Sequence, residues 1–178
     1  MKFDFVVLGA TGMQGKITTR DLVENGYSVL MCGRDKSRIE HFLKKYKNVD
    51  FEYVEAENIN NTSETIKKSG ANIAINCMEA EWNLNALQAC LQANVNCIDL
   101  GSEIYMTKKQ FALGKELKNK NLIAITGIGS VPGVGNIMLK YASKKFDAIS
   151  DLEVRFSWDS NIKKLVVTLS IGSIMEEI

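Results

Sequence analysis

Three glycines at a spacing of three residues stand where a short apolar run meets a helix-like run. The segment VLGATGMQGK places Gly9, Gly12 and Gly15 between FDFV and ITTRDLVENG. A helix that starts after such a turn presents free N–H groups and the positive end of its dipole, and glycine lets an anion approach the backbone. The spacing therefore predicts a site for the pyrophosphate of a dinucleotide. The alternative is a tight turn whose glycines serve helix–sheet packing alone.

The residues after the second apolar run indicate which dinucleotide would bind. An NAD site usually has an acidic residue there for the ribose hydroxyls, but this chain reads MCGRDKSR, with Arg34 next to the turn. A guanidinium can stack on adenine and pair with a 2′-phosphate, and Ser37 and Arg38 are in reach as helpers. We therefore expect NADP, with NAD less favoured. Asp35 could cap the next helix or turn back to a ribose hydroxyl.

The ends of the third and fourth apolar runs supply three further candidates. Glu55 follows the third run and is expected to reach the adenine edge, whereas Cys77 and Met78 end the fourth run, INCM, and are expected to lie under the nicotinamide half. The alternatives are that Glu55 is merely exposed and Cys77 is merely core.

Strand and helix patterns alternate regularly and would position these residues. The strands are expected at Lys2–Leu8, Tyr27–Cys32, Val49–Val54, Asn72–Cys77, Val95–Leu100 and Leu122–Thr126, and the helices at Gly12–Asn25, Asp35–Lys47, Thr62–Ser69, Glu81–Ala93 and Thr107–Asn119. Strands this apolar, separated by helices, predict a parallel sheet covered on both faces. The predicted fold class is α/β, a Rossmann-type doubly wound parallel sheet.

The pattern changes after residue 126, which predicts a second domain. A helix is expected at Val134–Phe146, and Asp151–Trp158 alternates with period two, so that Val154, Phe156 and Trp158 would share one face. A further strand is expected at Lys164–Ile171. We expect residues 1–130 to form the dinucleotide-binding domain, and residues 131–178 a connecting helix and part of an α+β substrate or dimerisation domain. That part would be cut short or completed by a partner chain, and a homodimer is the expected assembly.

Composition excludes several classes of protein. The 178 residues are 46% hydrophobic and 24% charged with a net charge of +1, which gives no basis for capture of nucleic acid or of an anionic membrane. No apolar run is long enough to span a bilayer, and no signal peptide is visible. The four cysteines lack metal-type spacing, and the single histidine, His41, excludes a multi-histidine metal site. A reduced, cytoplasmic protein without a metal is expected.

Several of these segments together resemble a known family. GATGMQG, then GRD, then ANIAINCMEAEWNLNALQACLQANVNCIDLGSE, and finally GSVPGVGN before a helix are similar to the saccharopine dehydrogenase family. The resemblance covers residues 3 to about 158 and concerns its NADP-binding domain, shared by saccharopine reductase, lysine dehydrogenase, and homospermidine and carboxynorspermidine enzymes. Two departures are Val131, where some members have aspartate, and Glu79–Ala80, where many have proline.

The resemblance implies an NADP-dependent oxidoreductase of amino-acid metabolism, including that of lysine. Its reaction is hydride transfer between a nicotinamide and a carbon–nitrogen bond of an amino acid or polyamine-type substrate. The implied cofactor contacts are Gly9, Thr11, Gly12, Met13, Gln14, Gly15, Arg34, Cys77 and Met78. The resemblance assigns no catalytic residue, because the family's substrate-recognising residues lie largely in a second domain. This chain alone could be inactive.

Two other functions compete with this interpretation. Tyr141 and Lys145 match the Y-x-x-x-K pair of short-chain dehydrogenases, with Ser130 upstream as a catalytic serine would be, and Tyr105–Lys109 repeats the spacing. A motif without its structural context is only a hypothesis, and this one leaves the strand at Val95–Leu100 unexplained. The other alternative is a non-catalytic NADP sensor or truncated paralogue, because a fold does not fix a function.

Three polar or aromatic residues near the predicted sheet edge have two interpretations each. Asp99 and Ser102 end the fifth strand and could touch substrate, but capping of the following helix is the favoured interpretation. Trp82 could line the cleft, but we expect it to anchor its helix.

Overall fold

The computed structural model describes residues 2–101 and 103–155. The chain divides into two compact units, Met1–Gly127 and Ile128–Ile178. The expectations for Ser102, Phe156, Trp158 and the strand at Lys164–Ile171 lie outside the described residues.

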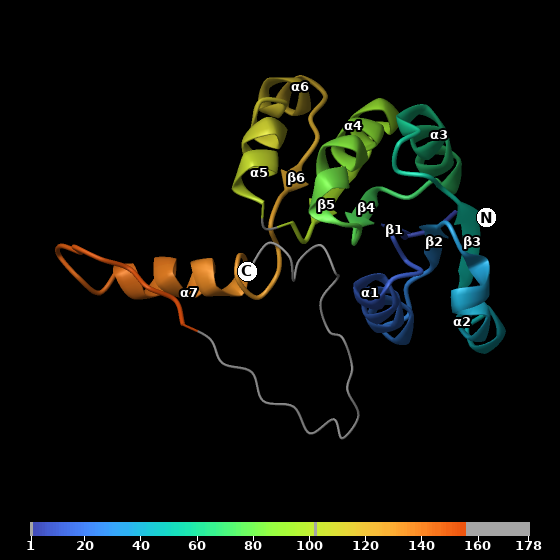
Figure 1. The fold of residues 1–178 in the computed structure, drawn as a ribbon, viewed down its shortest axis with the longest axis horizontal. Helices are drawn as coiled ribbons and strands as arrows, with labels where there is room; N and C mark the ends of the chain where they lie inside the picture. Colours follow the sequence, from blue (N-terminus) through green and yellow to red (C-terminus); the bar gives the residue numbers. More distant parts are fainter. Residues whose placement is uncertain (1, 102, 156–178) are drawn as a thin grey trace. The chain divides into compact units, whose positions relative to one another are not determined.

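The first unit is built on a parallel sheet of six strands (Figure 1). The strands are β1 (Phe5–Leu8), β2 (Val29–Gly33), β3 (Val49–Tyr53), β4 (Ile73–Asn76), β5 (Asn96–Asp99) and β6 (Ala124–Ile125). They lie in the order β3-β2-β1-β4-β5-β6, and every paired neighbour is parallel. The chain therefore reverses its direction of winding between β1 and β4, the place where doubly wound folds bind ligands. This confirms the predicted Rossmann-type fold.

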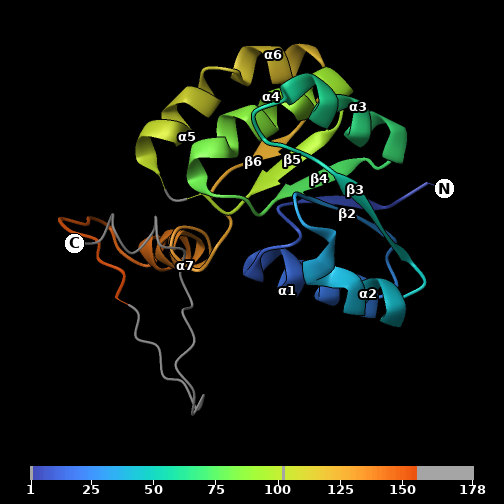
Figure 2. The ribbon, with the colours of Figure 1, turned by 45° about the vertical axis from the view of Figure 1, so that its right-hand side comes forward.

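Helices cover both faces of the sheet. The helices of the first unit are α1 (Met13–Glu24), α2 (Glu40–Lys45), α3 (Ile59–Ser69), α4 (Asn83–Ala93), α5 (Ile104–Phe111) and α6 (Gly114–Asn119), with 3₁₀ turns at Lys36–Ile39 and Ala80–Trp82. Figure 2 shows α1 and α2 on one face and α3 to α6 on the other. Helices on both faces explain why the central strands are apolar at successive positions rather than at alternate ones.

Two hydrophobic cores result, one on each side of the sheet. Val6 and Leu8 of β1 face the core that contains Ile66 of α3 and Leu87 of α4, whereas Val7 faces the core that contains Phe42 of α2. Successive side chains of a strand point to opposite faces, so one strand contributes to both cores. β1 is thereby packed on both of its sides.

Two predicted helices are interrupted in the structure. The segment expected as one helix at Asp35–Lys47 is a 3₁₀ turn followed by α2, and the segment expected at Thr107–Asn119 is α5 and α6. The second break lies at Ala112 and Leu113. It lets Leu113 and Leu117 pack against the larger core, a tertiary contact that local helix preference does not reveal.

The second unit contains α7 (Val134–Ser143), which follows a loop with a cis peptide bond before Pro132. Residues 151–155 form no strand, although the period-two pattern predicted one from Asp151. A strand needs a neighbour for its backbone groups, and within the described part of the second unit the only bridge joins Gly129 to Gly133. In residues 151–155, the alternation of apolar residues is thus not accompanied by strand pairing.

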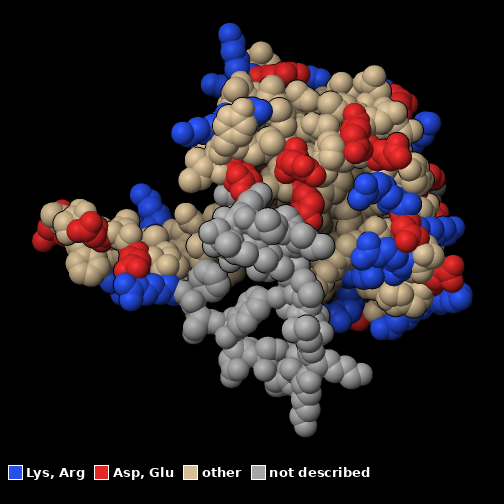
Figure 3. All heavy atoms as spheres, viewed as in Figure 1, with Lys and Arg blue, Asp and Glu red and all other residues tan. Residues whose placement is uncertain are grey.

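The described surface carries charges of both signs. On the face shown in Figure 3, acidic and basic side chains of the first unit are interspersed. In residues 2–101 and 103–155, no helix has the length and apolar character required to cross a membrane.

Candidate dinucleotide site

The turn between β1 and α1 forms the floor of the candidate site. Gly9 follows β1 with φ +73°, a conformation that L side chains rarely adopt. A Cβ at Gly9 would lie 2.8 Å from Cγ of Met78 and 2.9 Å from its backbone nitrogen. Glycine is therefore required here both by the backbone conformation and by the close approach of the chain after β4.

The third glycine of the motif holds α1 against this turn. A Cβ at Gly15 would lie against the carbonyl oxygen of Gly9 and 2.5 Å from Cα of Ala10. At the start of α1, Gly12 provides no side-chain cap and the first turn has no acidic residue. The first N–H groups of α1 are consequently not used by a capping side chain, as an anion site requires.

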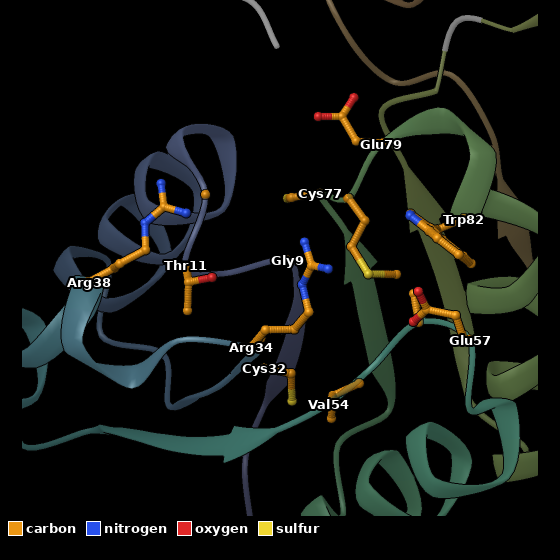
Figure 4. Close-up of a pocket in the computed structure, with 14 residues that line it drawn as sticks. Gly9, Thr11, Cys32, Arg34, Arg38, Val54, Glu57, Cys77, Glu79 and Trp82 are labelled. Atoms are coloured by element: carbon orange, nitrogen blue, oxygen red, sulfur yellow. The ribbon is translucent and has the colours of Figure 1, made fainter. Parts of the chain in front are cut away.

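A pocket of about 220 Å³ opens above this turn (Figure 4). Its walls come from the ends of β1, β2, β3 and β4, at the carboxyl edge of the sheet. The residues that line it are Gly9, Thr11, Gly12, Cys32, Gly33, Arg34, Arg38, Val54, Ala56, Glu57, Cys77, Met78, Glu79 and Trp82. The structure thus brings together six of the predicted cofactor contacts, namely Gly9, Thr11, Gly12, Arg34, Cys77 and Met78.

The remaining predicted contacts lie beside the pocket or are engaged elsewhere. Met13 and Gln14 are exposed in the first turn of α1, next to buried Gly15. The carboxylate of Asp35 caps the 3₁₀ turn after β2, because it accepts hydrogen bonds from the backbone nitrogen of Ser37 at 3.0 Å and from its hydroxyl at 2.6 Å. These bonds lower the pKa of Asp35.

Two arginines stand at the β2 wall of the pocket. Gly33 ends β2 where a Cβ would lie 2.8 Å from the side chain of Thr11, so the chain passes close to the glycine turn before Arg34. Figure 4 shows Arg34 extending across the pocket in front of Gly9, and Arg38 approaching near Thr11. Both side chains are exposed. The pocket therefore has a cationic wall on the side of β2.

The β3 wall differs from the prediction in its acidic residue. Val54 continues β3, with its N–H donating to the carbonyl of Gly33 at 3.1 Å, and is buried in the pocket wall. Side chains alternate along an extended chain, so Glu55 faces away, and it accepts a hydrogen bond from the hydroxyl of Tyr53. Glu57 lines the pocket instead. Residues 56–57 form a turn, so alternation no longer holds there and only the tertiary structure reveals Glu57.

The loop after β4 forms the opposite wall. Burial raises the pKa of the half-buried Cys77 thiol to about 11, although its contact with the Thr18 hydroxyl at 3.6 Å acts in the other direction. A thiol with this pKa is not a nucleophile near neutral pH. Trp82, which we expected to anchor its helix, lines the pocket. Figure 4 shows it across the pocket from the two arginines.

Two other sets of predicted residues do not line this pocket. Asp99 is buried and does not cap α5, whose N-cap is Glu103 without a side-chain bond. Tyr141 on α7 is 67% exposed, and the ammonium of Lys145 lies 5.4 Å from the centre of its ring. This is the geometry of a surface cation–π pair.

The fold is that of a Rossmann-type dinucleotide-binding domain. Residues 5–125 match the family model described as the saccharopine dehydrogenase NADP binding domain. The chain belongs to the saccharopine dehydrogenase family, an oxidoreductase family, which confirms the resemblance seen in the sequence.

Solved structures agree on the fold. Apo saccharopine dehydrogenase (L-Glu forming) from Saccharomyces cerevisiae matches with a TM-score of 0.65 and 13% identity, over 80% of this chain and 30% of that chain. A dTDP-glucose 4,6-dehydratase from Bacillus anthracis, solved in complex with NAD, matches with a TM-score of 0.54 and 11% identity, over 70% of this chain and 53% of that chain. No match was found among curated proteins. The chain thus spans under a third of the yeast enzyme.

Proposed function

We propose that this chain binds NADP(H) in the pocket at the carboxyl edge of the sheet and supplies the cofactor-binding part of an oxidoreductase that acts on a carbon–nitrogen bond. The observation that carries the cofactor is the pair of arginines, Arg34 and Arg38, on one wall of a pocket whose floor is the glycine turn. The family supports NADP as the dinucleotide.

The residues of the pocket fit the parts of an NADP molecule. The N–H groups at the start of α1 would receive the pyrophosphate, with Gly9 and Gly12 giving it access to the backbone. The guanidinium of Arg34 would pair with the 2′-phosphate and stack on the adenine. Val54 and Ala56 would contact the adenine from the segment that follows β3, and Glu57, rather than Glu55, has the position to accept its exocyclic N–H.

The opposite wall would hold the nicotinamide half. The sheet order places β2 and β3 on one side of β1, and β4 on the other, so the two halves of a dinucleotide divide at the glycine turn. Cys77 and Met78 would then lie against the nicotinamide side. The cofactor would donate or accept the hydride, and the protein's task is to orient the two reacting carbons and exclude water.

The substrate proposed is an amino acid or a polyamine-type amine. It rests on the family, whose name-giving reaction forms or breaks the carbon–nitrogen bond of saccharopine. None of the residues around the pocket is assigned as the proton donor of this reaction.

The proposal is tested by titrating the protein with NADPH and with NADH while recording intrinsic tryptophan fluorescence. We expect tighter binding of NADPH, and we expect Arg34→Ala to weaken NADPH binding about tenfold to hundredfold, the value of a charge-assisted contact to phosphate. NADH binding should weaken by less, because NADH loses only the stacking of Arg34 on the adenine. Arg20→Ala, which removes an exposed arginine from α1 outside the pocket, is the matched control.

Three results would change the conclusion. Tighter binding of NADH would refute the role of Arg34, and binding of neither nucleotide would leave the glycines with a packing role alone. Selective NADPH binding without reduction of any imine, formed from amino-acid or polyamine amines with aldehydes, would favour the non-catalytic sensor.

A further inference from the structure

Four polar side chains are buried behind the pocket without lining it. Asn76 ends β4, Asn83 begins α4, Asp99 ends β5 and Gln110 lies in α5, and each is only 1–2% exposed. Burial of polar groups is costly unless their hydrogen bonds are satisfied. A set drawn from four separate elements therefore requires a specific arrangement.

The Asn76 carboxamide closes the loop that forms one pocket wall. Its oxygen accepts a hydrogen bond from the backbone nitrogen of Met78 at 3.1 Å, and its nitrogen donates to the side-chain oxygen of Asn83 at 2.7 Å. These two bonds span residues 77–82. Cys77, Met78, Glu79 and Trp82, which line the pocket, all belong to this loop.

The Asp99 carboxylate holds the neighbouring strand ends. One oxygen accepts from the backbone nitrogens of Gly101 at 3.0 Å and Gly127 at 2.9 Å, and the other accepts from the side-chain nitrogen of Gln110 at 2.7 Å. Three donors on one buried carboxylate make strong, charge-assisted bonds. Gly127 is the last residue of the first unit, so this carboxylate fixes the point at which the chain leaves that unit.

Asn83 joins the two parts of the network. The side-chain nitrogen of Gln110 lies 3.4 Å from its backbone oxygen, and at Gly101 an added Cβ would collide with its side-chain nitrogen. Asn83 is thus confined by α5 and by the chain after β5. The side-chain oxygen of Gln110 is buried without a hydrogen-bond partner among the described residues, which is unfavourable. The side-chain nitrogen of the same residue donates to Asp99.

We propose that this network positions the loop 77–82 for the nicotinamide half of the dinucleotide. Asn76 is a positioning residue that acts directly on Met78, and Asp99 is a positioning residue that acts through Gln110 and Asn83. The inference rests on the proposed binding of NADP(H), because it assigns the loop to one half of that ligand.

The test compares NADPH with 2′,5′-ADP, which carries only the adenosine half. We expect Asn76→Ala to raise the NADPH dissociation constant about tenfold, the effect of one net hydrogen bond, and Asp99→Asn to raise it about threefold. Binding of 2′,5′-ADP should change by less than about twofold, because its contacts lie on the β2 and β3 side. A general loss of structure would instead weaken both ligands in parallel.

Asn96→Ala is the matched control. Asn96 lies at the other end of β5, where its side chain donates to the carbonyl of Asn72 at 3.1 Å and accepts from the nitrogen of Ile123 at 2.9 Å. The substitution removes the same number of side-chain hydrogen bonds as Asn76→Ala, but away from the pocket. Asn96→Ala should lower the melting temperature without changing the dissociation constant of NADPH relative to that of 2′,5′-ADP.

Hydrogen exchange of the free protein keeps this test separate from the test of the proposed function. If the wild-type chain binds neither ligand, the proposed function fails, and the network is judged by the Met78 amide alone. We expect that amide to exchange about tenfold faster in Asn76→Ala, and measurably faster in Asp99→Asn, than in Asn96→Ala. Unchanged Met78 exchange, or equal weakening of NADPH and 2′,5′-ADP binding, would overturn the inference.

Discussion

A methyl group added at Gly15 should separate α1 from the strand that precedes it. Gly15 lies in α1 with ordinary helical geometry, so alanine is compatible with its backbone conformation, and the cost is purely steric. The new Cβ would meet the carbonyl oxygen of Gly9, Cα of Ala10 at 2.5 Å and the carbonyl carbon of Gly9 at 2.8 Å. All three are backbone atoms, which cannot rotate away as a side chain can.

The magnitude follows from two opposing terms. Overpacking typically costs about 1–3 kcal/mol, and contact with backbone places this site at about 3 kcal/mol. Alanine in place of glycine returns about 1 kcal/mol of helix propensity, so Gly15→Ala should destabilise the fold by about 2 kcal/mol. For a chain of this size, that loss corresponds to a melting temperature lower by about 4–8 °C.

Gly114→Ala is the matched control, since it makes the same substitution at the start of α6. An added Cβ there has nothing within 4 Å. It should stabilise the protein by about 0.5 kcal/mol and raise the melting temperature by about 1–2 °C. Both variants are measured by thermal unfolding followed by circular dichroism. An unchanged or raised melting temperature for Gly15→Ala would refute the close packing of α1 on the glycine turn.

Two further predictions concern titratable groups. The pKa of Asp4 is lowered because its carboxylate accepts hydrogen bonds from the backbone nitrogen and the hydroxyl of Ser28, both at 2.7 Å. The stabilising contribution of Asp4 is therefore present above its pKa in the unfolded state and is lost as pH falls through its pKa in the folded state. Asp4→Asn should lower the melting temperature at neutral pH and converge with wild type in acid, and a constant difference across the pH range would contradict this. Because the pKa of Cys77 is raised to about 11, about one thiol in a thousand is ionised at pH 8. Alkylation of Cys77 by iodoacetamide, followed by peptide mass spectrometry, should accelerate about tenfold per pH unit from pH 8 to pH 10 and slow with NADPH, whereas rapid alkylation independent of pH would disprove the burial of the thiol.

The sequence by itself determined the sheet and the glycine turn. Both are local signals. The apolar runs mark the strands, and the glycines mark positions where the backbone has a positive φ or where a Cβ would collide with neighbouring atoms. Gly9 and Gly12 are on the pocket lining, as is Arg34 directly after β2. These positions follow from the rule that carboxyl ends of parallel strands meet at one edge.

The tertiary structure decided which side chains face the pocket and which support it. Glu57 rather than Glu55 lines the pocket, because Glu55 is bonded to Tyr53 and the chain turns at residues 56–57. Trp82, in the loop after β4, lines the pocket as well. The Asp99 carboxylate accepts hydrogen bonds from Gly101, Gln110 and Gly127 and does not cap a helix. Its partners are up to 28 residues away, and no local pattern of polarity can reveal which distant donors a buried carboxylate will meet.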